Sequence, residues 1–315
     1  MDTITHLTFG ACTGEILLGE KLGKKAMLFG ALAANIPDVD TVFGLFVPGD
    51  EALLLHRGIT HSFFFAVFAG LLLAYFFSKY YVNVTYCAFA LFFCLELGLH
   101  DLLDTCTSYG TGLLEPFSHQ RFSFHLLFVI DPLFTISLLV ATIVLLIKKP
   151  DGLTRKWWAS GAIVISLLYV GFAICCKSGL DDKATLTTPA PFNCLLWYCI
   201  RKTDGGYYTG YQSVFDKSPV SYEYHPSNNS LLRQPEPYLI TFADGYYTLS
   251  KSGDQLYFNV LRFGQIQGWR QKDAPFVLSY PLQDKGGENL IIQKGRLAGW
   301  NAKSIRQYLE RIGGK

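Results

Sequence analysis

One apolar stretch of the sequence ends in a line of ionisable side chains. Glu96, His100 and Asp104 are spaced four residues apart, which places them on one stripe of an α-helix. His100 and Asp104, on successive turns, can ligate one cation. Glu96, one turn deeper, can orient His100 or act as a further ligand or base. Ionisable groups in a membrane span cost roughly 2.5 to 3.5 kcal/mol each and usually mark function, although a structural polar stripe is the alternative.

Two carboxylates follow the helix-breaking Pro37. Asp38 and Asp40 are two residues apart, and in extended backbone such side chains point the same way. The pair can therefore hold a hard or borderline cation. Asp is also favoured in turns and helix caps, so the pair taken alone fits either role.

Two histidines five residues apart form a third cluster. His56 and His61 do not share a helix face, but Gly58 allows a tight loop before a helix that begins near Thr60. Both imidazoles can then converge on one point. Arg57 suits a phosphate or carboxylate, because a guanidinium forms bidentate contacts with these anions. The alternative is a set of interfacial residues that bind lipid head groups.

Two more ionisable residues belong to the same expected face. His6 precedes the first apolar segment, and Asp131 lies near one end of a later segment, where it also fits the N-terminal dipole of a helix. Together with the three clusters they form a mixed set of His and carboxylate donors. Such donors suit Zn²⁺, in a site of one to three ions that activates water for hydrolysis.

Four apolar stretches are long enough to cross or nearly cross about 30 Å of hydrocarbon. They comprise residues 63–77, 84–103, 126–147 and 158–176. Two weaker stretches, 7–18 and 26–46, are short or interrupted by Gly and Pro, which fits a helical hairpin that ends at Pro37. The expected fold is mainly α, with a polytopic transmembrane bundle of about six segments.

Basic residues predict the orientation of these segments. If all six cross, the loops on one side contain a group of lysines and arginines, while the opposite short loops hold little beyond Arg57 and Arg121. The group consists of Lys21, Lys24, Lys25, Lys79, Lys148, Lys149, Arg155 and Lys156. By the positive-inside rule this side is cytoplasmic. The three clusters and everything after Lys177 are then expected to be extracytoplasmic.

Composition separates the chain into two parts. Half of the 315 residues are hydrophobic and 17% are charged, with a mean hydropathy of +0.25, as in proteins partly embedded in lipid. We expect residues 1–178 to form the bundle with the metal site. Residues 179–315 alternate short apolar runs with turn residues, which predicts a small mixed α/β, strand-rich soluble domain that closes with an amphipathic helix at 302–312. The net charge of +2 shows no basic stripe, so nucleic acid is not an expected partner.

Five segments give the chain a family resemblance. They are MDTITH at 1–6, PDVD at 37–40, HRGITHS at 56–62, HDLLD at 100–104 and TSYGTGLLEPFS at 107–118. Together they resemble the YdjM-like, LexA-regulated family of membrane-bound metal-dependent hydrolases of the bacterial inner membrane, which implies a distant similarity to zinc-dependent phospholipase C. The resemblance implies metal binding at His6, Asp38, Asp40, His56, His61, His100 and Asp104. His125 stands where the family pattern suggests an acidic residue, so the metal count stays open.

The function expected from these observations is hydrolysis of a phosphoester, with a membrane lipid as the substrate, at the outer membrane–water boundary. Arg57 would hold the phosphate, and Glu96 or a carboxylate such as Asp131 would take the proton. The alternative is an ion- or proton-coupled transporter in which Glu96, His100 and Asp104 form the path; it predicts ionisable groups spread through the membrane depth. A third possibility is an adaptor whose outer domain binds a protein partner.

Overall fold

The computed structural model of the chain describes residues 1–47, 49–147, 152–180, 183–231, 236–271, 273–282, 292–293 and 299–315. These residues form two compact units. The first comprises Met1–Phe43 and Leu55–Phe172, and the second comprises Gly44–Leu54 and Ala173–Lys315. Two lysines of the expected cytoplasmic loops, Lys148 and Lys149, lie outside the described residues.

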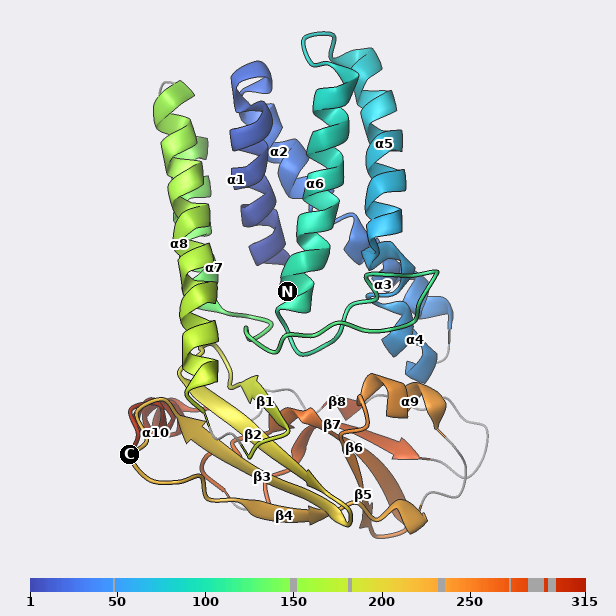
Figure 1. Cartoon of the computed structure of the whole chain (residues 1–315), viewed down its shortest axis with the longest axis vertical. Coiled ribbons are helices and arrows are strands. Elements are labelled where there is room, and N and C mark those ends of the chain that lie inside the picture. Colours follow the sequence, from blue (N-terminus) through green and yellow to red (C-terminus); the bar gives the residue numbers. More distant parts are fainter. Residues whose placement is uncertain are drawn as a thin grey trace. The chain divides into compact units, whose positions relative to one another are not determined.

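The first unit is a helical bundle in which α1, α2, α6 and α5 lie side by side (Figure 1). Its helices are α1 (Thr3–Leu22), α2 (Lys24–Ala33), η1 (Pro37–Val39), α3 (Asp40–Phe43), η3 (Ile59–His61), α5 (Phe63–Tyr80), α6 (Tyr86–Thr105), α7 (Pro132–Ile147) and α8 (Gly152–Ser178). Side-chain oxygens cap three helix starts: Asp2, Ser62 and Thr85 accept from amides in the first turns of α1, α5 and α6.

Glycines allow α1 and α2 to approach to backbone contact. A Cβ placed on Gly10 would lie 2.4 Å from the carbonyl oxygen of Gly30, and one on Gly14 would lie 2.3 Å from that of Ala26. A larger residue at these positions would force the helices apart, so small residues set this spacing, as in many membrane helix pairs. The two helices place His6 and the Pro37 turn at the same end of the bundle, since both lie next to Asp104 and His100 of α6.

Aromatic residues of α6 fill the centre of the bundle. Phe89, Phe92 and Leu97 are fully buried and pack with Ala66 and Ala74 of α5. The outward faces of these helices remain apolar, with Phe64, Phe68 and other large side chains exposed. Exposed apolar faces around a buried core are typical of helices that lie in lipid.

Within the part of the chain that the structure describes, three helices are long and apolar enough to cross a membrane: α5, α6 and α8. A fourth span results if α2 and Pro37–Phe46, bent by 46° relative to each other, count as one. The prediction of six spans is not confirmed. The expected segment 126–147 becomes helical only at Pro132 and leaves the 16 residues of α7, while α1 carries Thr, His and Glu side chains that lower its hydropathy.

The second unit contains two four-stranded antiparallel sheets, with strand orders β1-β2-β3-β4 and β5-β6-β7-β8. The strands are β1 (Leu186–Pro189), β2 (Leu196–Thr203), β3 (Gly206–Ser213), β4 (Glu223–Pro226), β5 (Tyr247–Ser252), β6 (Gln255–Gln265), β7 (Phe276–Leu282) and β8 (Ile292–Gln293). The helices are η2 (Gly44–Phe46), α4 (Gly49–Leu55), η4 (Asn229–Leu231), α9 (Pro237–Phe242) and α10 (Ala302–Ile312). The prediction of a strand-rich C-terminal region is confirmed.

Short hairpins set the register of these sheets. Thr203 pairs with Gly206 across the β2–β3 turn, and Ser252 pairs with Gln255 across the β5–β6 turn, where Gly253 adopts a positive φ of 60°. Tyr198 of β2 and Leu261 of β6 are buried in a common core. The closing helix α10 occupies the predicted residues, and Asn301 starts it with a capping box.

Candidate metal centre

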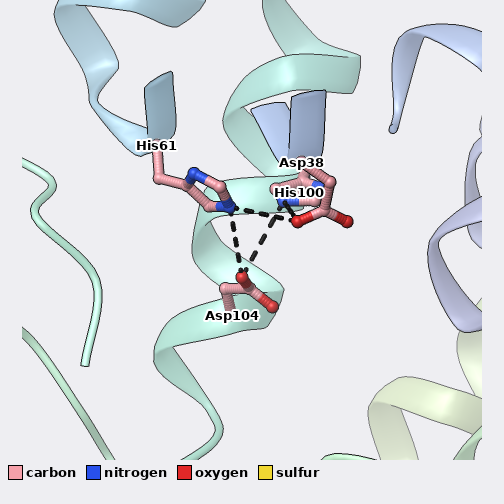
Figure 2. A group of neighbouring side chains, drawn as sticks. All are labelled: Asp38, His61, His100 and Asp104. Atoms are coloured by element: carbon pink, nitrogen blue, oxygen red, sulfur yellow. Dashed lines mark ion pairs between the residues drawn. The ribbon is translucent and has the colours of Figure 1, made fainter. Parts of the chain in front are cut away.

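Four side chains from three helical elements meet at one end of the bundle. Asp38 comes from η1, His61 from η3, and both His100 and Asp104 from α6. Figure 2 shows the four groups pointing toward one another. Nε2 of His61 lies 3.4 Å from Oδ1 of Asp38 and 3.5 Å from Oδ2 of Asp104, and Nε2 of His100 lies 3.8 Å from each of the same oxygens.

These separations fit a metal ion. One ligand atom from each of the four residues lies within 4.8 Å of all the others. Tetrahedral ligands at about 2.0 to 2.2 Å from Zn²⁺ are separated from one another by roughly 3.3 to 3.6 Å, close to the observed 3.4 to 3.8 Å. Two imidazoles and two carboxylates are also ligands that zinc accepts. The residues present therefore fit a divalent ion.

Hydrogen bonds fix both imidazoles in the form that binds metals. Nδ1 of His100 lies 2.6 Å from the carbonyl oxygen of Ala34, which can only accept, so Nδ1 carries the proton. Nδ1 of His61 lies 3.1 Å from Oγ1 of Thr60 and 3.2 Å from Oδ2 of Asp40. Because the Thr60 hydroxyl donates its own proton to Asp40, both oxygens can only accept from Nδ1, which therefore carries the proton. Each Nε2 is left with a lone pair that points into the centre.

The atoms at the centre are buried without a hydrogen-bond partner among the described residues. They are Nε2 of His61, Nε2 of His100 and Oδ2 of Asp104, and the three side chains are at most 1% exposed. A buried polar atom without a partner costs about 1 to 3 kcal/mol. Oδ2 of Asp104 has an ion-pair contact with Nε of Arg57 at 3.0 Å, but the two imidazole nitrogens have no such cationic or donor partner among the described residues to accept from, and a cation between them and the carboxylate would satisfy all three atoms.

His6 joins the centre from α1. Its Nε2 lies 3.2 Å from Oδ1 of Asp104, and its ring stacks on that of His100 at a centroid distance of 3.8 Å. The amino group of Met1 also contacts Oδ1 of Asp104. His6 therefore borders the four-residue group through Asp104.

Arg57 is directed at Asp104 and not at solvent. It is only 4% exposed, and its Nε lies 3.0 Å from Oδ2 of Asp104. One terminal nitrogen donates to Oγ1 of Thr107 at 2.8 Å, and the guanidinium lies over the ring of Tyr109. Burial lowers the pKa of Arg57 to about 10, so the group stays charged at neutral pH. These contacts support compensation of the Asp104 charge more than binding of a substrate phosphate.

Asp40 and His56 form a second group with His61. The prediction that Asp38 and Asp40 lie in extended backbone is wrong, because Pro37–Val39 is a 3₁₀ turn and Asp40 has helical φ and ψ of −59° and −25°. Residues two apart on a helical turn point in roughly opposite directions, about 200° to 240° apart. Asp38 therefore faces Nε2 of His61, whereas Asp40 faces its Nδ1.

Glu96 and His100 have different partners, although they share a stripe of α6. Oε1 of Glu96 accepts a hydrogen bond from Oγ1 of Thr13 at 2.5 Å, and Oε2 is buried without a hydrogen-bond partner among the described residues. The Ala34 carbonyl oxygen accepts from Nδ1 of His100 and orients the ring, a role that the sequence analysis expected for Glu96.

Asp131 caps a helix. Its Oδ1 accepts from the amides of Leu133 and Phe134 at the start of α7, and its Oδ2 accepts from the hydroxyl of Tyr169 at 3.1 Å. Burial raises the pKa of Asp131 to about 6. Among the described residues, it belongs to neither group that could hold a metal.

Two features of the site were not predicted. One is the Ala34 carbonyl, a backbone atom for which no side-chain pattern gives a signal. The other is Asp101, which is buried with neither carboxylate oxygen hydrogen-bonded among the described residues. Its position directly after His100 in an apolar stretch could have indicated a functional acid, but Asp101 does not fit the four-residue spacing of Glu96, His100 and Asp104. His125, where an acidic residue was expected, adopts a positive φ of 52° and lies 3.4 Å from Oγ of Ser123.

Residues 1–180, more than half of the chain, match the family described as YdjM inner membrane protein. The chain belongs to this family. Among relatives of this YdjM-family protein, "Uncharacterized protein YfhP" of Bacillus subtilis (strain 168) is 29% identical over 177 residues, which are 53% of this chain and 50% of YfhP. "Inner membrane protein YbcI" of Escherichia coli (strain K12) is 35% identical over 122 residues, which are 38% of this chain and 69% of YbcI. No solved structure matches.

The match covers every residue of the candidate centre and leaves most of the strand-rich unit outside. The YdjM family and the apolar helices identify a membrane protein, and the relative from Escherichia coli is named for the inner membrane. The chain spans half the length of YfhP, whose name states no activity. Chemistry must therefore be argued from the centre itself.

Proposed function

We propose that this YdjM-family protein is a membrane-bound, metal-dependent hydrolase of phosphoesters, with a phospholipid as the preferred class of substrate. The observation that carries the proposal is the convergence of Nε2 of His61, Nε2 of His100 and Oδ2 of Asp104, all buried without a hydrogen-bond partner among the described residues. Such an arrangement is costly unless a cation completes it.

Each residue of the centre has a distinct proposed role. Asp38, His61, His100 and Asp104 would hold a divalent ion, preferably Zn²⁺, given their mixed nitrogen and oxygen donors. When bound, such an ion lowers the pKa of water to near neutrality and polarises a phosphoryl oxygen. Asp38 is the member with the most exposed side chain, at 26%, so a substrate would approach from its side. Arg57 would keep Asp104 ionised next to the reacting phosphate.

The surroundings of the centre support a lipid substrate. An apolar groove of about 510 Å³ begins at Phe63, two residues after His61, and is lined mainly by residues of α5 and of the loop at 113–117, including Phe64, Phe68 and Phe117. A groove of this size can accept part of an acyl chain. We further propose an extracytoplasmic centre and C-terminal unit, from the distribution of Lys and Arg between loops.

Metal analysis combined with a hydrolysis screen tests this function. The purified full chain in detergent should contain stoichiometric zinc, manganese or iron by elemental analysis. It should hydrolyse bis(p-nitrophenyl) phosphate or phospholipids in mixed micelles, and a chelator should abolish the activity. His100→Ala and His61→Ala should each lower activity by more than about 100-fold, because even outer partners of metal ligands contribute about 10- to 100-fold.

His119→Gln is the matched control. His119 pairs with Glu115 at 2.9 Å, but its side chain is 87% exposed, so the change should leave metal content and activity unaltered. Full activity in both His100→Ala and His61→Ala, or a purified protein free of all three metals, would refute the proposal.

A further inference from the structure

We infer that the centre takes a single divalent ion and that Asp40 is a positioning carboxylate for His61 and not a metal ligand. The inference rests on the proposed function, because it concerns the same site. The inference assigns different roles to the two groups of His and acidic residues, which the sequence analysis had expected to form one set of ligands.

Distances distinguish the two groups. In the group of Asp38, His61, His100 and Asp104, the His–carboxylate separations are 3.4 to 3.8 Å, long for a hydrogen bond and suited to ligands on either side of an ion. In the other group, Nδ1 of His56 lies only 2.8 Å from Oδ1 of Asp40. That separation is a hydrogen bond, and it is too short for two tetrahedral ligands of one Zn²⁺.

The donors around Asp40 use its accepting capacity. Oδ1 accepts from Nδ1 of His56, while Oδ2 accepts from the amide of Arg57 at 3.1 Å and from Oγ1 of Thr60 at 2.7 Å. Nδ1 of His61 faces the same Oδ2 at 3.2 Å. An ionised carboxylate has about four lone-pair sites. Three hydrogen bonds and the facing imidazole therefore surround this carboxylate, so it is already coordinated by protein donors.

Asp40 acts on the ion through His61. The carboxylate, directly at 3.2 Å and through the Thr60 hydroxyl, keeps the proton on Nδ1, so that Nε2 keeps its lone pair and points at Asp38 and Asp104. A carboxylate behind a metal-binding imidazole fixes its orientation and raises its basicity. His56, with 31% of its side chain exposed, contributes one donor to Asp40 and no ligand.

Counting ions in variants tests the inference. The purified full chain is stripped with a chelator, reloaded with Zn²⁺ or Co²⁺ and freed of excess metal, and bound metal per chain is measured. We expect one ion per chain in the wild type and in His56→Ala, and none in His100→Ala. The d–d absorption of the Co²⁺ form should be the same in the wild type and in His56→Ala, since the ligands do not change.

Asp40→Asn tests the positioning role. The amide cannot accept on both atoms, so His61 loses part of its support. The variant should still bind one ion, with an affinity about 10- to 100-fold weaker and a shifted Co²⁺ spectrum. His119→Gln serves again as the control, because it removes a similar His–carboxylate contact on the surface.

The outcomes separate this inference from the proposed function. Two ions per wild-type chain, with one lost in His56→Ala, would overturn the single-ion centre and leave metal-dependent hydrolysis standing. Unchanged affinity and spectrum in Asp40→Asn would overturn the positioning role. A chain that binds neither Zn²⁺ nor Co²⁺ would overturn both. If Asp40→Asn does not fold, the ion counts of wild type and His56→Ala still decide whether the centre takes one ion.

Discussion

Buried charges occur in two settings in the helical unit, and only one of them is complete. Toward the middle of α1, Glu15 and Arg155 form a paired set: Nε of Arg155 donates to Oε1 at 2.7 Å and a terminal nitrogen donates to Oε2 at 2.5 Å. The remaining terminal nitrogen donates to the carbonyl oxygen of Leu145 at 3.2 Å. At the candidate centre, His61 and His100 keep their Nε2 atoms without a hydrogen-bond partner among the described residues.

The two groups differ in whether their buried polar atoms have partners. Both settings are expensive to bury, so burial alone does not distinguish a structural ion pair from a functional site. The distinction lies in which atoms remain without partners after the side chains have paired. The Glu15–Arg155 pair satisfies its own polar atoms, whereas the centre retains buried atoms without a hydrogen-bond partner among the described residues.

The largest expected effect comes from breaking the complete pair. Arg155→Met leaves the Glu15 carboxylate buried without its cation, so the free energy of unfolding should fall by about 3 to 5 kcal/mol. Unfolding in mixed detergent–SDS micelles measures it. The double variant Glu15→Gln, Arg155→Met should recover most of the loss. A loss below about 1 kcal/mol in the single variant would show that the pair does not stabilise the bundle.

A smaller effect on the free energy of unfolding is expected from the buried carboxyl group of Asp131, which belongs to neither group. The pKa of Asp131 is raised from 3.8 to about 6 by burial, so between these values the folded state binds a proton that the unfolded state has released. The contribution is fully present below pH 3.8 and is lost as the pH rises through 6, by about 3 kcal/mol at most. Asp131→Asn should remove this part of the pH dependence. Parallel stability curves for the two proteins from pH 4 to 7 would contradict the expectation.

The smallest expected effect is the stabilisation of the protein by Zn²⁺ bound at the candidate centre. At a free Zn²⁺ concentration ten times the Kd, linkage should raise the free energy of unfolding of the wild type by about 1.4 kcal/mol. His100→Ala should show no increase, whereas Arg155→Met should gain as much as the wild type. Equal gains in wild type and His100→Ala would mean that Zn²⁺ binds elsewhere.

The sequence predicted the donor types of the centre and most elements that carry them. The spacing of His100 and Asp104 required one helix face, and α6 provides it. The split between Asp38 and Asp40 could not be predicted, because it depends on whether the turn after Pro37 is extended or helical. Likewise, the support of His100 by a carbonyl 66 positions earlier in the chain is a property of tertiary packing.

The span count failed for a related reason. The apolar run at residues 126–130 precedes Asp131 and Pro132, which start the helix, and a hydropathy window averages over such a boundary. The amphipathic pattern of α10 was informative because its apolar positions and the cap at Asn301 agree. Elements that carry both a periodic pattern and a start signal were therefore placed best.

The glycine contact between α1 and α2 has a consequence for ion selectivity. Backbone atoms of Gly10 and Gly30 lie in close contact. A backbone contact cannot adapt by changing side-chain rotamers, so it fixes the distance between the two helices. Helix α1 carries His6, which contacts the candidate ligands His100 and Asp104, and the chain that leaves α2 carries Asp38. A frame this stiff resists expansion, so it should favour a small ion such as Zn²⁺ over Ca²⁺, whose ligands stand at about 2.3 to 2.6 Å.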